Sequence, residues 1–249
     1  MSHEGKVAVV TGAGRNIGEA IAHRLAGDGA AIAVVDLDQG RADKVVADLT
    51  GKGVSAAAFV CDVSSPEQIE ATVDRIHGGR IDILVNNVAI SDNKNILDID
   101  LATWQRTLDI TLTAPFYFAK CVAHKMVEDQ RVGNIVNVSS TTGYFGRGRA
   151  IAYAAAKGGV VNLTRAMAIQ LADYNIRVNS VVPNKIGSPV GKDDFDPSRP
   201  IVNLRNRAGV PNDLANAVAF LVSDQSDFIV GADLFVDGGC SVIMPGGSG

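Results

Sequence analysis

The sequence is poor in cysteine and contains no disulfide framework. Its 249 residues include three cysteines, Cys61, Cys121 and Cys240, which lie far apart and form no Cys-x-x-Cys pair. Because an odd number cannot complete a set of disulfides, we expect a reducing compartment and a cytoplasmic location. Histidine is also sparse, and no metal site is expected because no metal-ligand spacing connects the four residues His3, His23, His77 and His124.

Long hydrophobic runs and an excess of positive charge are absent as well. No window of about 18 uninterrupted apolar residues occurs, which excludes a membrane span. Residues 1–6 lack the apolar stretch of a secretory signal. The 23 Lys and Arg against 27 Asp and Glu give a net charge of −4, so there is no basic footprint for nucleic acid. We therefore expect a small-molecule partner.

Apolar, β-branched runs alternate with helical patterns along the whole chain. The composition, 47% hydrophobic and 20% charged, suits a large core and argues against disorder. Continuous apolar runs such as residues 32–35 are typical of parallel strands buried on both faces. The alternation predicts one doubly wound α/β domain over residues 1–249, with a mostly or wholly parallel seven-stranded sheet and helices on both faces. The expected strands span residues 7–11, 31–36, 55–61, 81–86, 133–139, 176–182 and 232–236.

One segment breaks this alternation. Between Pro183 and Pro211 the chain is polar and rich in charges of both signs. A stretch of this length without an apolar period is either a functional lid or a disordered excursion, and we expect residues 184–210 to cover the substrate. The residues from Pro245 onward, Pro-Gly-Gly-Ser-Gly, are typical of a flexible tail.

A glycine-rich turn follows the first expected strand, and a helix begins inside it, in Thr11-Gly12-Ala13-Gly14-Arg15-Asn16-Ile17-Gly18. Glycines allow a sharp turn and let backbone N–H groups approach a pyrophosphate, while the helix N-terminus supplies partial positive charge. The spacing differs from Gly-x-Gly-x-x-Gly, so the alternative is a tight loop that binds nothing. A P-loop is disfavoured because no Lys-Ser or Lys-Thr pair follows the glycines.

Asp36 ends the second expected strand about twenty residues after this turn, where a carboxylate can accept two hydrogen bonds from an adenosine ribose. The carboxylate would also repel a 2′-phosphate, and neither Leu37 nor Asp38 is basic, so NAD is favoured over NADP. Arg15 is the contrary indication, because a cation in the turn could hold that phosphate. The alternative for Asp36 is an ordinary exposed acid at a strand end.

Polar residues also follow the third and fourth expected strands. Asp62 could hydrogen-bond an adenine amino group or cap a helix, although Ser64 or Ser65 before Pro66 suits the cap better. Asn87 is expected to tie neighbouring loops together through its side-chain amide.

Tyr153 and Lys157 stand four residues apart, on one face of an expected helix. At an effective dielectric of ~20, a cation ~5 Å away favours the phenolate by ~3 kcal/mol and moves the pKa of tyrosine from ~10 toward the working pH. A general acid and base requires such a pKa. Such a pair is also common as a solvated surface contact. Ser140, however, ends the fifth expected strand, where its hydroxyl could hold a substrate oxygen against the tyrosine.

In the order and spacing of these landmarks, the sequence resembles the short-chain dehydrogenases/reductases over nearly its whole length. Further matching landmarks are Asn86-Asn87, Pro183, residues 186–188 and Val236-Asp237-Gly238-Gly239. The resemblance implies a Rossmann-type NAD(P)-binding domain and an oxidoreductase that interconverts a secondary alcohol and a ketone by hydride transfer. It also implies a homo-oligomer, a tetramer or a dimer, with helices of residues 104–126 and 153–174 at the interface.

The resemblance further assigns roles to residues. Tyr153 would exchange a proton with the substrate oxygen, Ser140 would orient that oxygen, and Lys157 would bind the nicotinamide ribose and lower the pKa of Tyr153. The implied cofactor-binding residues are Gly12, Gly14, Arg15, Asn16, Ile17, Gly18, Asp36, Leu37, Asp62, Val63, Asn87, Ala89, Tyr153, Lys157, Pro183, Ile186 and Ser188.

Two departures from the family pattern bear on activity. Asn16 stands where the family usually has glycine, and asparagine tolerates left-handed backbone better than most residues. Thr111 stands where the family places the asparagine of its catalytic tetrad, so the proton relay that this asparagine supports would be rearranged or slower.

These departures leave three functions open. The leading hypothesis is an NAD-linked alcohol dehydrogenase or ketone reductase. The first alternative is a cofactor-binding sensor or scaffold without turnover. The second is an epimerase or lyase on the same fold, which fold analogy alone does not exclude.

Overall fold

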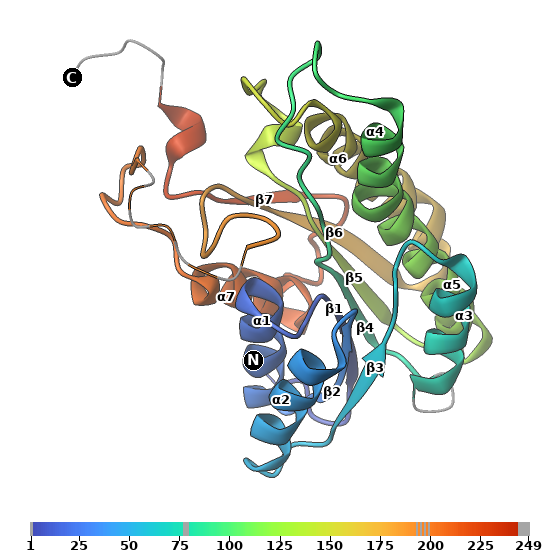
Figure 1. The fold of residues 1–249 in the computed structure, drawn as a ribbon. Coiled ribbons are helices and arrows are strands. Elements are labelled where there is room, and N and C mark those ends of the chain that lie inside the picture. The colour runs from blue at the N-terminus through green and yellow to red at the C-terminus, as the bar shows by residue number, and fades with distance from the viewer. Residues whose placement is uncertain are drawn as a thin grey trace.

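The computed structural model describes residues 2–76, 80–192, 194, 196, 198 and 200–243, and in this part of the chain seven parallel strands form one sheet (Figure 1). Their order is β3-β2-β1-β4-β5-β6-β7, so the direction of winding reverses between β1 and β4. The predicted doubly wound α/β fold with a wholly parallel sheet is confirmed. The strands are β1 (Val7–Thr11), β2 (Ala31–Asp36), β3 (Ala56–Val60), β4 (Ile83–Asn86), β5 (Gly133–Val138), β6 (Ile176–Pro183) and β7 (Asp233–Val236).

Helices cover both faces of the sheet (Figure 1). One face carries α1 (Asn16–Gly27), α2 (Gln39–Thr50) and α7 (Pro211–Leu221); the other carries α3 (Pro66–Arg75), α4 (Leu101–Leu108), α5 (Ala114–Glu128) and α6 (Ile151–Leu171). Strand β1 contributes to both apolar cores, with Ala8 and Val10 in one and Val7 and Val9 in the other. Burial on both sides explains why this strand is apolar at successive positions.

The largest difference from the predicted strand ends is at β4, which begins at Ile83 rather than at residue 81. The side chain of Asp82 explains the late start. Its Oδ2 accepts the Val7 backbone N–H at 2.8 Å, so a carboxylate takes a bond that a strand carbonyl would otherwise receive. Arg131 lies 3.1 Å from the other carboxylate oxygen and balances its charge.

The polar segment that follows β6 turns back on itself. Ile186 forms an isolated parallel bridge with Gly209, and the Gly187 N–H donates to the Gly209 carbonyl at 3.0 Å. The Lys185 ammonium donates to the Pro200 carbonyl at 3.0 Å. These contacts hold the beginning of the segment, residues 185–187, against its later part, near residues 200 and 209, beyond the carboxyl end of β6.

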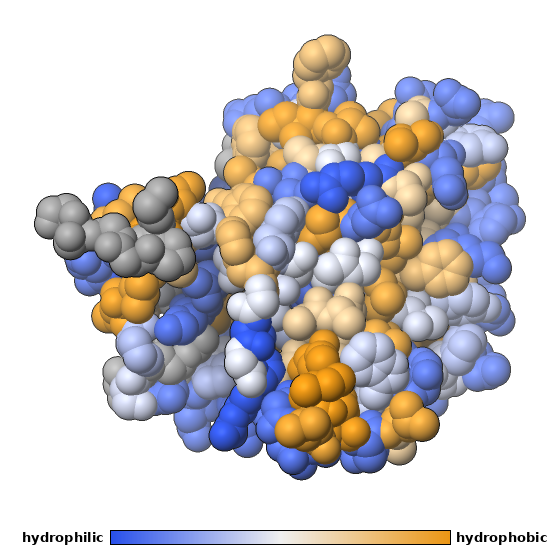
Figure 2. All heavy atoms as spheres, turned by 90° about the horizontal axis from the view of Figure 1, so that it is seen from above, coloured by the Kyte–Doolittle hydropathy of each residue, from blue (hydrophilic) through white to orange (hydrophobic). Residues whose placement is uncertain are grey.

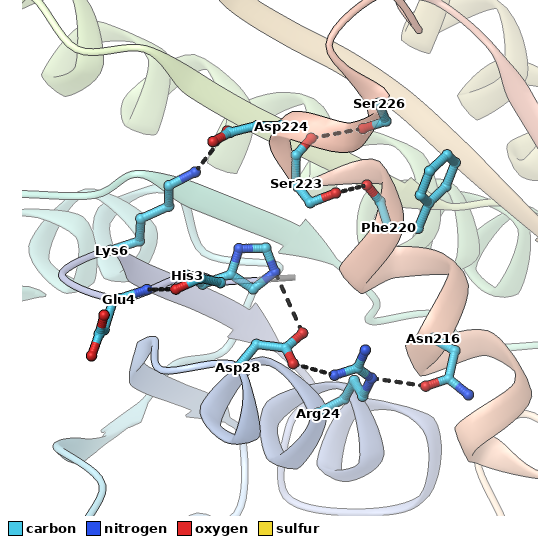
Figure 3. A network of polar contacts seen from close by, with 11 residues as sticks. His3, Glu4, Lys6, Arg24, Asp28, Asn216, Phe220, Ser223, Asp224 and Ser226 are labelled. Carbon is cyan, nitrogen blue, oxygen red and sulfur yellow. Dashed lines mark hydrogen bonds and ion pairs between the residues drawn. The ribbon is translucent and has the colours of Figure 1, made fainter.

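A polar network near the N-terminus joins α1 to α7 (Figure 3). His3 is fully buried, and its Nε2 lies 3.8 Å from Oδ2 of Asp28. Burial lowers the pKa of His3 in spite of the nearby carboxylate. Arg24 donates to the other oxygen of Asp28 and, through Nε, to Asn216 of α7 at 2.8 Å. The network therefore fixes the end of α1 against α7.

The described residues contain neither a membrane-spanning helix nor a cluster of metal ligands. No described helix is both long and apolar enough to cross a bilayer. The same residues hold no cluster of three or more His, Cys, Asp or Glu side chains suited to a metal ion. His77 and the expected tail from Pro245 lie outside the described residues.

Candidate active site

A cavity of about 620 Å³ opens at the carboxyl edge of the sheet. Its walls come from the residues that follow β1, β2, β3, β4, β5 and β6, and this is where an open α/β sheet binds its ligands. The volume lies within the range of about 300–1,000 Å³ typical of small-molecule sites. Figure 2 looks down on the molecule from the side of the loop that precedes α4 and shows hydrophilic and apolar side chains close together on this face.

The cavity brings together most of the site residues predicted from the sequence. Those that line it are Gly12, Arg15, Asn16, Ile17, Gly18, Asp36, Leu37, Asp62, Val63, Asn87, Ala89, Ser140, Tyr153, Lys157, Pro183, Ile186 and Ser188. Gly14 and Thr111 are not among the lining residues.

The glycine turn after β1 is closely packed. A Cβ on Gly18 would lie 2.0 Å from the carbonyl oxygen of Gly12, so no larger residue fits there without moving the backbone. Asn16 has a φ of 50°, as expected for an asparagine in a left-handed position. The amide of Asn87 donates to the carbonyls of Thr11 at 3.0 Å and Gly12 at 3.2 Å, which is the loop-tying role that the sequence predicts.

Asp36 is buried and held by two backbone N–H groups. Its Oδ2 accepts from Gly14 at 2.9 Å, and its Oδ1 accepts from Asp38 at 3.1 Å. Gly14 thus holds the carboxylate of Asp36 in place but does not itself line the cavity. The alternative of an exposed strand-end acid is wrong, because only 8% of this residue is exposed.

Arg41 is a cavity residue that the sequence analysis missed. It lies in the first turn of α2 and lines the cavity beside Arg15, whose pKa is lowered by burial and by the charge of Arg41. The signal that could have found it is its place five residues after Asp36, in the first turn of the next helix.

Asp62 is engaged in a local turn. Its Oδ1 accepts from the backbone N–H and the hydroxyl of Ser64, at 2.9 and 2.7 Å, and these bonds lower the pKa of Asp62. Ser65 caps α3, with its hydroxyl accepting from Gln68, and Pro66 is the first helical residue. The sequence preference for a serine as the cap is confirmed.

Ser140, Tyr153 and Lys157 meet inside the cavity. Tyr153 is 5% exposed and Ser140 is 8% exposed, and the serine hydroxyl acts to lower the pKa of the tyrosine. Lys157 is 3% exposed, and its ammonium donates to the Val138 carbonyl at 2.6 Å. The Lys157 Nζ lies 5.7 Å from the centre of the Tyr153 ring.

The predicted pKa of Tyr153 needs correction. Burial raises this pKa, while the hydrogen bond from Ser140 and the charge of Arg147 act in the opposite direction with smaller effect. Burial also lowers the pKa of Lys157 to about 7. The sequence argument counted the attraction between the two groups at an effective dielectric of ~20 and no cost of burial, whereas in the fold both groups are buried and desolvation outweighs their attraction.

The start of α6, which carries Tyr153, is held by the loop after β4. The N-cap residue Ala150 has a φ of 65° and provides no side-chain hydrogen bond. Instead, the Lys94 carbonyl accepts the Ala150 N–H at 2.7 Å, and Oδ1 of Asp92 accepts the Tyr153 N–H at 3.1 Å. Asp92 therefore fixes the backbone of the tyrosine from a separate segment.

Thr111 lies in a π-helical turn, Asp109–Thr113, which interrupts the helix expected over residues 104–126. The residue is fully buried. Its hydroxyl accepts from the Ile90 N–H at 3.1 Å and donates to the Ile90 carbonyl at 3.2 Å. It links the turn to a loop of the cavity wall instead of facing the cavity.

The chain is similar to known dehydrogenases over nearly its full length. Residues 12–241 match a family model described as enoyl-(acyl carrier protein) reductase. A cis-4-hydroxycyclohexanecarboxylate dehydrogenase of Sinomonas cyclohexanicum is 39% identical over 246 residues, 96% of this chain and 97% of the relative. A 2-dehydro-3-deoxy-D-gluconate 5-dehydrogenase of Formosa agariphila is 37% identical over 245 residues, 95% and 92% of the two chains. The structure of NAD⁺-bound xylitol dehydrogenase superposes with a TM-score of 0.88 at 36% identity, covering 96% of this chain and 100% of the other.

Proposed function

The chain belongs to the short-chain dehydrogenase/reductase family and is an oxidoreductase, and from this premise we propose that it interconverts a secondary alcohol and a ketone, with Tyr153 as acid and base. The observation that carries the proposal is that two buried hydroxyls, Ser140 and Tyr153, line one cavity at the strand ends together with the buried ammonium of Lys157. A substrate oxygen placed between these two hydroxyls can receive a hydrogen bond from each of them.

The residues present suit a dinucleotide cofactor. The close approach of Gly18 to Gly12 leaves room only for backbone, as a pyrophosphate turn requires, and α1 begins there without a side-chain cap. When bound, NAD supplies the hydride acceptor, or NADH the donor. The residues that would hold it are Gly12 to Gly18 at the pyrophosphate, Asp36 at the adenosine ribose, Asp62 and Val63 at adenine, Asn87 and Ala89 along the cleft, and Lys157, Pro183, Ile186 and Ser188 at the nicotinamide half.

Proton transfer then depends on Tyr153. In the reducing direction the neutral phenol donates its proton to the carbonyl oxygen, which the raised pKa favours at neutral pH. In the oxidising direction the phenol must first lose its proton. Oxidation should therefore rise with pH above neutrality, while reduction should fall.

We propose NAD as the preferred cofactor because the fixed carboxylate of Asp36 would repel a 2′-phosphate. Arg15 and Arg41 line the same end of the cavity and would attract that phosphate if the carboxylate were removed. The test compares kcat/KM for NAD and NADP in the wild type and in Asp36→Ser. We expect NAD to be preferred by the wild type and the ratio to move toward NADP in the variant. A wild-type preference for NADP would contradict the assignment.

The decisive experiment follows nicotinamide absorbance during incubation with a panel of secondary alcohols and ketones. Net cofactor reduction or oxidation supports the proposal. Tight NAD binding without turnover would indicate a sensor or scaffold, and product without net redox change would indicate an epimerase or lyase. Tyr153→Phe should abolish turnover while NAD affinity stays within a few-fold, and unchanged turnover would remove Tyr153 from the mechanism.

We also propose a homo-oligomer that uses the exposed side of α5 and α6. Phe116 of α5, Ile169 of α6 and Tyr174, just beyond the end of α6, expose 44%, 78% and 51% of their surfaces. A cavity of about 250 Å³ lies between the two helices, with Phe116 and Tyr174 in its wall. Sedimentation velocity tests this proposal, and a monomer at micromolar concentration would refute it.

A further inference from the structure

The charges that line the cavity are separated along the sheet. Its two described carboxylates, Asp36 and Asp62, follow β2 and β3. On the side of β5 and β6, the described charged residues are all cations, Arg147, Lys157, Lys185 and Lys192. Strands β2 and β5 are three strand spacings apart, on the order of 14 Å. This exceeds the screening length of about 8 Å at physiological salt, so Asp36 does not neutralise the cations.

Arg147 and Lys192 differ from the other two cations of this group. The ammonium of Lys157 donates to Val138, and that of Lys185 donates to Pro200. For the side chains of Arg147 and Lys192, no ion pair or hydrogen bond occurs within the described part of the chain. Of these two cations, Arg147 is the one whose charge acts on Tyr153. Asp92 is the acid on the neighbouring loop, and its carboxylate accepts the N–H groups of Tyr153 and Lys94 at 3.1 and 3.4 Å.

Arg147 is nevertheless close to the reacting groups. Arg147 and Tyr153 line one cavity, and the charge of Arg147 is the smaller of two effects that oppose the rise in the pKa of Tyr153 caused by burial. Phe145, Pro189 and Val190 line this side as well, and Phe145 and Val190 are 51% and 42% exposed. The walls therefore offer a guanidinium, apolar contact surface and two hydroxyls within the same space.

We propose that the substrate is a hydroxy acid or the corresponding oxo acid, with its carboxylate on the guanidinium of Arg147 and its reacting oxygen at Ser140 and Tyr153. The apolar side chains then contact the carbon skeleton between the two polar ends. An arginine is suited to this task because its planar fork of N–H groups matches a carboxylate in two parallel hydrogen bonds. This inference rests on the proposed function.

The test compares hydroxycarboxylic acids of increasing chain length, each beside its own uncharged carboxamide. Loss of a hydrogen bond to a charged group costs about 10- to 150-fold. We therefore expect kcat/KM for the best acid to exceed that of its amide by about this factor. Arg147→Gln should lower kcat/KM for the acid at least tenfold more than for the amide, mainly through KM, and Arg147→Lys should recover part of the loss.

Arg149 provides the matched control. It lies two residues further along the same exposed loop but does not line the cavity, so Arg149→Gln should leave the ratio of acid to amide unchanged. Equal use of acids and amides by the wild type, or an equal loss for both in Arg147→Gln, would overturn the inference. If Arg149→Gln lowered the ratio of acid to amide as much as Arg147→Gln does, the effect would come from the overall charge of the loop. That result would also overturn the inference.

Calorimetric titration of the same acids into the NAD-loaded protein separates this inference from the proposed function. The titration measures the affinity for the acid, and so the contact with Arg147, without requiring turnover. If no alcohol in the panel changes nicotinamide absorbance but acids still bind more weakly to Arg147→Gln than to Arg149→Gln, the anion site stands and the proposed reaction fails. If turnover occurs and binding is the same in both variants, the reaction stands and the anion site fails.

Discussion

Replacing Lys157 with methionine should make the protein more stable at neutral pH while removing its activity. Burial holds the pKa of Lys157 at about 7 in the fold, against 10.5 for a solvated lysine. Between these values the unfolded chain binds a proton that the folded chain releases. The wild type is therefore destabilised at pH 7 by about 4 kcal/mol, and its free energy of unfolding should rise with pH by up to about 1.4 kcal/mol per pH unit.

The variant also loses a favourable contact. The ammonium donates to the Val138 carbonyl at 2.6 Å, and leaving that carbonyl without its donor costs about 1–3 kcal/mol. The net gain expected for Lys157→Met at pH 7 is therefore about 1–3 kcal/mol. At pH 9.5 the remaining cost of the buried lysine is about 1 kcal/mol, so the gain should shrink by about 3 kcal/mol and reach zero or change sign.

Reversible urea denaturation, followed by circular dichroism at pH 7.0 and pH 9.5, measures both differences. Lys44→Met is the matched control, because Lys44 is an exposed residue of α2 and its replacement should give the same small change at both pH values. A stability difference between Lys157→Met and the wild type that does not vary with pH would refute the reasoning. Turnover should be lost in the variant, since Lys157 is assigned to the nicotinamide half of the cofactor.

Three further predictions test how the site is held in place. Asp92→Ala removes the acceptor of the Tyr153 N–H and should lower the free energy of unfolding by about 1 kcal/mol and reduce kcat. Asp92→Ser should recover both, and denaturation and steady-state kinetics measure the two effects. Gly18→Ala places a Cβ 2.0 Å from the Gly12 carbonyl and should weaken NAD binding at least tenfold by calorimetry; unchanged affinity would mean that the turn does not contact the cofactor. Thr111→Val removes two hydrogen bonds to the loop after β4 and should cost about 1–3 kcal/mol of unfolding free energy, and a smaller loss would show that water replaces the hydroxyl.

The sequence was sufficient to predict the sheet because its signals are local. Each strand is a short apolar run, and strands buried on both faces cannot alternate with polar residues, so their number and parallel direction follow from the pattern. The same holds for the glycine turn, where Asn16 takes the left-handed conformation expected of it. The start of β4 was misplaced because the side chain of Asp82 bonds to β1, which is far away in sequence.

The features that the sequence did not reveal depend on contacts between distant segments. The helix pattern of residues 104–126 contains no sign of a π-helical turn, which accompanies the bonds between Thr111 and Ile90. The pKa of Tyr153 depends on its burial by several loops that form the cavity. The spacing of residues along one helix carries no information about those loops. The role of Asp92 at the start of α6 likewise becomes visible only when the loop after β4 is placed beside that helix.

The reversal of strand order between β1 and β4 also separates the residues assigned to the cofactor from those assigned to the substrate. Residues assigned to the nucleotide come mainly from the half before β5, whereas the hydroxyls and Arg147 come from the half that begins with β5. Exchange of the loops after β5 and β6 can thus change the specificity for the alcohol or ketone substrate, while the preference between NAD and NADP stays the same. A chimaera that takes these two loops from another dehydrogenase should acquire its donor's substrates and keep its host's coenzyme.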